Sequence, residues 1–124
     1  MPRLQRKSLA SPDLVRPFTF GHVDVVNLDE TAVARFTWEP GWRWSKDVAP
    51  VVKTASCQNR HVGYVTSGTL HVQMDDGTES EIHHGDAYEI PPGHDAWTVG
   101  NEPCVMVDFG ASIGQYAKAP GPHA

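Results

Sequence analysis

The stretch from Cys57 to Trp97 constrains the fold more than any other part of the chain, because short β-type runs alternate in it with strong turn signals. The turn signals are Ser67-Gly68, Asp75-Asp76-Gly77 and Pro91-Pro92-Gly93. Such residues end strands, because glycine adopts backbone angles that other residues avoid and proline lacks the ladder donor. Short runs that turns interrupt this often are typical of an antiparallel sandwich or barrel.

The flanking segments continue this pattern. Residues 23–28 are expected to form a short strand, and residues 32–38 alternate their side chains with the period of a half-buried strand. A further strand is expected at 104–109, where only Asp108 interrupts the apolar residues. Residues 45–50 are interpreted as a loop, and Val51-Val52 as the start of another strand. No convincing amphipathic helix is found, so the sequence predicts an all-β domain of about nine or ten short antiparallel strands.

A chain of 124 residues is the size of one domain and buries enough surface to fold without a disulfide or a metal. We divide it into an N-terminal arm at 1–17, a barrel at 18–110 and a C-terminal tail at 111–124. The arm is basic and contains prolines, and the tail is rich in glycine and proline, so neither has the pattern of a core element.

The net charge of −5 is mild and spread along the chain, which argues against a nucleic-acid or polybasic membrane surface. No apolar run has the length of a membrane span, and the basic N-terminus lacks the apolar segment of a secretory signal. Two cysteines without framework spacing are typical of a reducing compartment. We therefore expect a cytoplasmic protein with neither a nucleic-acid nor a membrane partner.

The sequence at 63–97 resembles the two conserved blocks of the cupins, which are small jelly-roll barrels, or double-stranded β-helices. The first block is written G-X5-H-X-H-X3,4-E-X6-G, and Gly68 matches its closing glycine. The second block is G-X5-P-X-G-X2-H-X3-N, and it is matched by Gly85, Pro91 and Gly93. The chain is also similar to small bacterial cupins of no assigned reaction that carry related W-R-W, C-Q-x-R-H and P-P-G-H-D-A-W blocks. The resemblance implies a cupin barrel and a homodimer.

The chain departs from the cupin pattern at every metal-ligand position. In the first block, His61 stands at the glutamate position, and Ala55 and Cys57 stand at the two histidine positions. In the second block, Ala96 and Gly100 replace the histidine and the asparagine. A metal site copied from the family is therefore excluded, and a rearranged site is the remaining question.

Three residues are candidates for such a rearranged metal site: Cys57, His61 and His94. Cys57 and His61 are an even number of residues apart, so an uninterrupted strand directs both to one side, which the resemblance makes the barrel interior. His94 points into the same cavity if its segment stays extended. A thiolate and two imidazoles suit Zn²⁺ first and Fe²⁺ next, and three ligands leave one position open. The alternative is a buried cysteine with hydrogen-bonded histidines and no metal.

Other residues are weaker candidates. The proposed wall of a substrate pocket consists of Trp44, Arg60, Tyr64, Asp95 and Trp97. Asp108 is a candidate acceptor for a ligating imidazole. Simpler roles compete with these: Trp42 and Trp44 as core or dimer-interface aromatics, Arg60 as a surface charge, and Asp95 as a turn residue. We expect Cys104 in the core, and three histidines facing solvent: His71, His83 and His84.

Three functions remain open. The first is a metal-dependent oxygenase, isomerase or lyase that acts on a small organic acid or a sugar-like molecule. The second is a non-catalytic module that binds or senses a small molecule without metal. The third is a protein whose ancestral site has decayed and which acts through its dimer surface. Fold alone does not decide among them.

Overall fold

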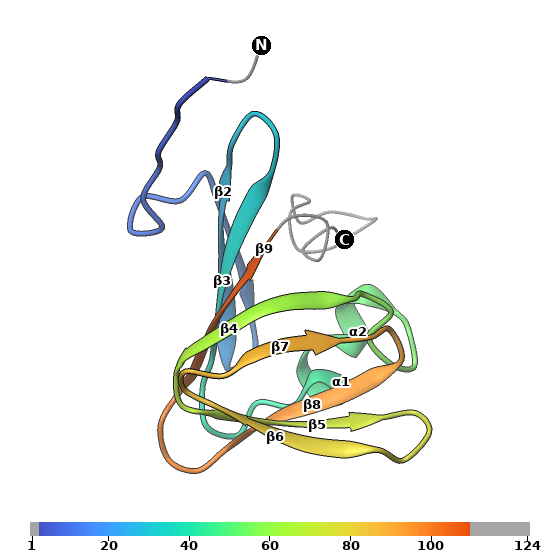
Figure 1. Ribbon diagram of the computed structural model, residues 1–124. Coiled ribbons are helices and arrows are strands. Elements are labelled where there is room, and N and C mark those ends of the chain that lie inside the picture. The colour runs from blue at the N-terminus through green and yellow to red at the C-terminus, as the bar shows by residue number, and fades with distance from the viewer. Residues whose placement is uncertain (1–2, 110–124) are drawn as a thin grey trace.

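The computed structural model describes residues 3–109, in which nine strands and two short helices form (Figure 1). The N-terminal elements are β1 (Leu14–Phe18), β2 (Gly21–Asn27), β3 (Ala32–Trp38), α1 (Trp44–Asp47) and α2 (Ala49–Val52). The remaining strands are β4 (His61–Ser67), β5 (Thr69–Met74), β6 (Glu79–His83), β7 (Ala87–Ile90), β8 (His94–Val99) and β9 (Cys104–Phe109). This is the all-β double-stranded β-helix that the sequence predicts.

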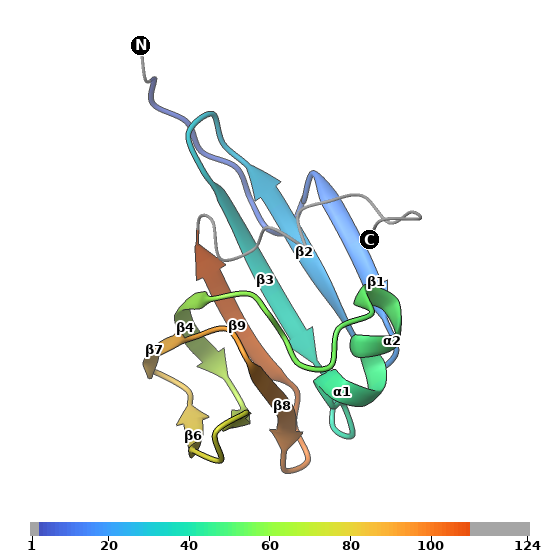
Figure 2. The same ribbon diagram turned by 90° about the vertical axis from the view of Figure 1, so that its right-hand side faces the viewer.

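The strands form two antiparallel sheets. The larger has the order β1-β2-β3-β9-β4-β7, and the smaller has the order β6-β5-β8 (Figures 1 and 2). In β4, β8 and β9, alternate residues are buried, because successive side chains of a strand lie on opposite faces. Strand β9 illustrates this, since Cys104, Met106 and Asp108 are buried and the residues between them are more exposed. Aromatic side chains fill much of the core, and the rings of Trp38 and Trp42 stack at 4.1 Å.

The expected turns are present at Gly68, Gly77 and Gly93, all of which have positive φ. Two local predictions are wrong. Residues 45–50 and Val51-Val52 belong largely to α1 and α2 rather than to a loop and a strand. Proline in the first turn favours a helix, and Pro50 occupies that position in α2.

The sheet begins earlier than the sequence indicated, because β1 pairs with β2 from Leu14, inside the segment assigned to the arm. The expected C-terminal tail at 111–124 lies outside the described residues. Within residues 3–109, no helix is both long enough and apolar enough to cross a membrane.

Two backbone pairings bring distant segments together. Cys57, four residues before the start of β4, bridges to the first residue of β8: its N–H donates to the carbonyl of His94 at 2.8 Å. Cys57 also accepts from the N–H of Gly93 at 2.7 Å. On the other side of β4, Gly63 pairs with Asp108 of β9. Residues that lie far apart in the sequence therefore converge at the start of β4.

Candidate metal centre

The three predicted ligands converge in the barrel. One potential ligand atom from each of Cys57, His61 and His94 lies within 4.8 Å of the others. All three residues are buried, with exposed fractions of 0%, 6% and 3%. The Cys57 Sγ lies 3.4 Å from the His61 Nε2, and the two imidazole rings are 5.2 Å apart. The three side chains therefore lie together as expected, although the strand assumed between Cys57 and His61 is absent, since residues 58–60 lie outside the strands.

The hydrogen bonds of the two histidines determine which ring nitrogen is available as a ligand. The Nδ1 of His61 lies 2.5 Å from a carboxylate oxygen of Asp108. The Nδ1 of His94 lies 2.8 Å from the carbonyl oxygen of Pro91. Because a carbonyl and an ionised carboxylate only accept, both Nδ1 atoms donate, and each Nε2 is left to face a metal ion. This arrangement is typical of histidines that ligate metals.

Asp108 is fully buried and accepts two hydrogen bonds. One comes from His61, and the other is a short bond from the Tyr88 hydroxyl. Burial, together with the Asp108 charge, raises the pKa of Tyr88 far above its usual value, so the phenol stays protonated. Tyr88 and Asp108 thus hold the His61 ring from the side opposite Cys57.

Cys57 and His61 each stabilise the charged form of the other. Burial opposes ionisation of Cys57, but hydrogen bonds and positive charge from His61 and His94 outweigh it and lower the pKa of Cys57 to about 6. Burial likewise disfavours the charged form of His61, yet Asp108 and then Cys57 raise the pKa of His61 to about 9. The metal-free centre therefore holds a thiolate beside an imidazolium near neutral pH. A thiolate is the form of cysteine that binds metals.

A small cavity of about 30 Å³ adjoins the centre. This volume holds one or two water molecules. Its walls are mostly apolar, and they include the rings of Trp42 and Trp44 as well as both histidines. The full lining is Phe36, Trp38, Trp42, Trp44, His61, Leu70, Ile90, His94, Ala96 and Met106.

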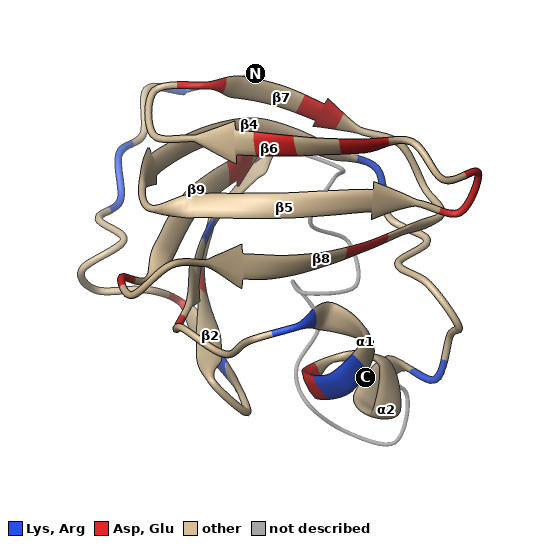
Figure 3. Ribbon diagram, turned by 90° about the horizontal axis from the view of Figure 1, so that it is seen from below, with Lys and Arg blue, Asp and Glu red and all other residues tan. Residues whose placement is uncertain are grey.

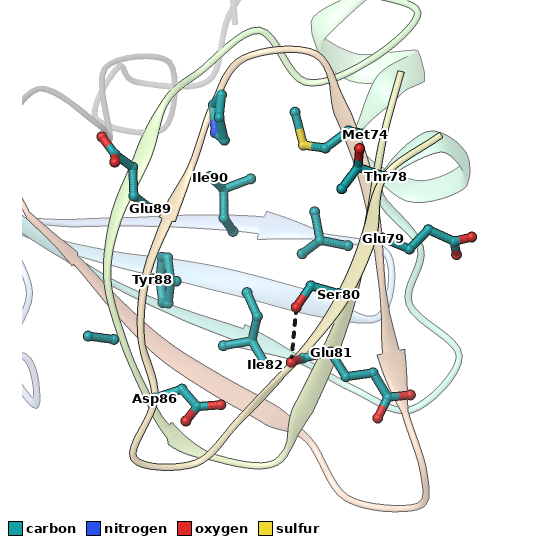
Figure 4. Close-up of a pocket in the computed structure, with 13 residues that line it drawn as sticks. Met74, Thr78, Glu79, Ser80, Glu81, Ile82, Asp86, Tyr88, Glu89 and Ile90 are labelled. Carbon is teal, nitrogen blue, oxygen red and sulfur yellow. Dashed lines mark hydrogen bonds between the residues drawn. The ribbon is translucent and has the colours of Figure 1, made fainter. Parts of the chain in front are cut away.

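A larger groove of about 370 Å³ lies between β6 and β7, the edge strands of the two sheets (Figure 4). Apolar side chains form its interior: Val72, Met74, Ile82, Tyr88 and Ile90. The carboxylates of Glu79, Glu81 and Glu89 point away from this interior (Figure 4). Figure 3 shows acidic residues along both edge strands, β6 and β7. Ile90 lines both the groove and the small cavity, so this one residue borders the two spaces.

Comparison with known proteins agrees with this architecture. The cupin domain family matches residues 56–110. The fold is similar to an RmlC-like cupin from Shewanella frigidimarina, with 16% identity, a TM-score of 0.60, and coverage of 90% of this chain and 95% of that chain. A cupin-like protein from Thermotoga maritima is 22% identical, with a TM-score of 0.54 and coverage of 78% of this chain and 73% of that one.

The chain contains a cupin domain and has the cupin fold. The polyketide cyclase RemF from Streptomyces resistomycificus is also similar in fold, with 17% identity, a TM-score of 0.60, and coverage of 87% of this chain and 79% of that chain. No curated protein matches the chain by sequence. Cupins similar in fold carry different names and activities, so the reaction has to be argued from the site.

Four of the five side chains expected to line the pocket lie elsewhere, which corrects the prediction. Asp95 and Trp97 lie on the outer face of β8, because they alternate there with buried residues. Asp95 accepts hydrogen bonds from Arg43 and Ser45, and the Trp97 ring stacks on His71. Tyr64 is 43% exposed on β4, and Arg60 forms an exposed ion pair with Glu89. Only Trp44 lines the small cavity.

The remaining assignments are closer to the structure. Cys104 is buried in the core, and burial raises the pKa of its thiol to about 12. His83 and His84 are exposed as expected, whereas His71 is half-buried because it packs on Trp97 and contacts Glu79. Tyr88 was missed as part of the centre. Its position on β7, facing Gly63 of the neighbouring strand, depends on strand pairing that the sequence does not specify.

A pH titration tests whether Cys57 is a thiolate. In metal-free protein, we expect thiolate absorbance near 240 nm to appear as the pH rises through about 6, the lowered pKa of Cys57. The signal should vanish in Cys57→Ala and remain in Cys104→Ala, since Cys104 ionises only near 12. A midpoint at the ordinary cysteine value of about 8.5 would contradict the charged pair.

Proposed function

We propose that this cupin binds one divalent metal ion through the Cys57 sulfur and the Nε2 atoms of His61 and His94. The observation that carries the proposal is the hydrogen bonding of both Nδ1 atoms, which leaves both Nε2 atoms available beside a thiolate. Sulfur and imidazole ligands favour zinc over iron. With three protein ligands, such an ion polarises a bound molecule or activates water at its open position.

The protein side chains have separate roles in this proposal. Asp108 orients the His61 ring and balances its charge, and the Pro91 carbonyl orients His94. The apolar wall of the small cavity limits the access of bulk water to the centre. The groove between β6 and β7 has the volume of a small organic ligand, and Ile90 is where that ligand would approach the centre.

Metal analysis tests the proposal directly. Protein prepared without a nickel column or a chelator is expected to contain about one zinc or iron ion per chain by elemental analysis. The Cys57→Ala and His94→Ala variants should lose the ion, because each removes one of three ligands. Cys104→Ala is the matched control, since it removes the other fully buried cysteine and should leave the metal content unchanged.

A metal-free binding module is the second candidate, and the groove is the observation that favours it. The groove of about 370 Å³ does not include the three proposed ligands. If the purified protein is metal-free, takes up no added zinc and unfolds at the same temperature with or without EDTA, this second function replaces the first.

We also propose that the protein is a homodimer. Apolar side chains on the outer face of the large sheet support this, including the exposed Tyr64 and the half-buried Val62, Val105 and Val107. A sheet face of this composition is stabilised when it packs against another surface. The cytoplasmic location remains a prediction from the use of cysteine.

A further inference from the structure

Two buried hydrogen-bond donors beside the centre have no acceptor. Trp42 and Trp44 are 3% and 2% exposed, and within residues 3–109 neither indole Nε1 has a hydrogen-bond partner. A buried indole N–H normally finds an acceptor, because leaving a buried donor unpaired costs about 1–3 kcal/mol. Two such donors two residues apart therefore indicate a missing ligand more strongly than one would.

Both rings are held firmly. The Trp42 ring stacks on Trp38 at 4.1 Å, and the Trp42 carbonyl accepts a hydrogen bond from the Thr98 N–H at 3.1 Å. Trp44 is the first residue of α1, and its side chain is among the largest that are fully buried in the described residues. Rings enclosed in this way cannot turn their N–H groups to solvent, so only a bound molecule can supply the missing hydrogen-bond acceptor.

The small cavity is where such an acceptor fits. Trp42 and Trp44 are both among its lining residues, together with His61 and His94, and its other lining side chains are apolar. Once the two Nε2 atoms face a metal ion, the lining side chains present N–H donors and no acceptor. This composition favours an anion or an oxygen acceptor over a cation or an amine. The volume of about 30 Å³ admits the end of a molecule but not a sugar ring.

We infer that the indole N–H groups of Trp42 and Trp44 bind the acceptor end of the ligand, so that the ligand class of this centre is a small carboxylate or another oxyanion. The inference rests on the proposed metal site, whose open position would hold the ligand from the other side. It narrows the ligand from organic molecules in general to those that end in an anionic acceptor.

Titration of the zinc-loaded protein with formate tests this inference, with azide as a second anion and methylammonium as a cation of similar size. The readout is the indole N–H signals in ¹⁵N-resolved NMR spectra, assigned in the wild-type protein so that no variant has to fold. Formate and azide are expected to shift the signals of Trp42 and Trp44 and to leave that of Trp97, on the outer sheet face, unchanged. Methylammonium should shift none of the four.

Phenylalanine variants measure the strength of the contact. Trp42→Phe and Trp44→Phe should each weaken formate binding roughly tenfold to a hundredfold, as expected for loss of one hydrogen bond to a charged group. Trp97→Phe is the control, because Trp97 lies on the outer face of β8 and does not line the cavity. Its effect should stay within about threefold.

The outcomes separate this inference from the metal proposal. If zinc binds but formate leaves both indole signals unmoved, or binds as tightly to the two variants, the inference is wrong and the metal site stands. If zinc does not bind, the same titration of metal-free protein decides. Shifts at Trp42 and Trp44 then support an anion site without metal, and their absence overturns the inference as well.

Discussion

Replacing Asp108 with asparagine is expected to weaken zinc binding by roughly tenfold to a hundredfold, because Asp108 orients the His61 ring and increases its basicity. The same change should destabilise the metal-free protein by about 3–5 kcal/mol, since it removes one of the two negative charges, Asp108 and the Cys57 thiolate, that balance the buried imidazolium. Zinc affinity is measured by competition with a chromophoric chelator, and stability by urea unfolding of the metal-free protein at neutral pH.

Tyr88→Phe is the matched control for Asp108→Asn. It removes the other donor to the same carboxylate but keeps the negative charge. We expect a loss of about 1–3 kcal/mol in stability and little change in zinc affinity. Equal effects of the two substitutions on zinc affinity would mean that packing around Asp108, rather than its charge, supports His61.

Gly68→Ala is expected to destabilise the barrel by more than about 3 kcal/mol, so that little of the variant folds. Gly68 has a φ of 80°, and a Cβ at this position would lie 2.2 Å from the Pro103 carbonyl oxygen and 2.7 Å from the Cys104 Cα. Both obstacles are backbone atoms, which cannot turn aside as a side chain does. Circular dichroism and urea unfolding measure the loss.

Gly77→Ala separates the two causes. Gly77 has a similar φ of 91°, but a Cβ there meets no atom within 4 Å. It should therefore show only the backbone penalty of about 1–2 kcal/mol. If the two alanine variants were equally stable, the steric clash of the Gly68 Cβ with Pro103 would contribute nothing to the loss of stability.

Local patterns in the sequence were enough to predict the barrel. The glycines at the turns and the alternation in β3 depend only on neighbouring residues, and both are present in the structure. The short helices were missed because two single helical turns are too brief to produce a period of 3.6 residues.

The candidate site was predictable only in part. The even spacing of Cys57 and His61 indicated the right side for both, although residues 58–60 between them are not part of a strand. The same parity, applied to β8 from the buried His94, would have put Asp95 and Trp97 outside. The partnership of Tyr88 with Asp108 was not predictable, because it joins β7 to β9 across β4, and these strands are not neighbours in the sequence.

The backbone bridge between Cys57 and His94 has a consequence for how the centre acquires its ion. Because main-chain hydrogen bonds already fix these two residues, the apo barrel does not need to order a loop around an incoming cation. Metal binding is therefore not required for folding here, unlike in zinc fingers, which unfold when the metal is removed. If the proposed metal site is correct, the metal-free protein is expected to stay folded and to bind the ion without refolding.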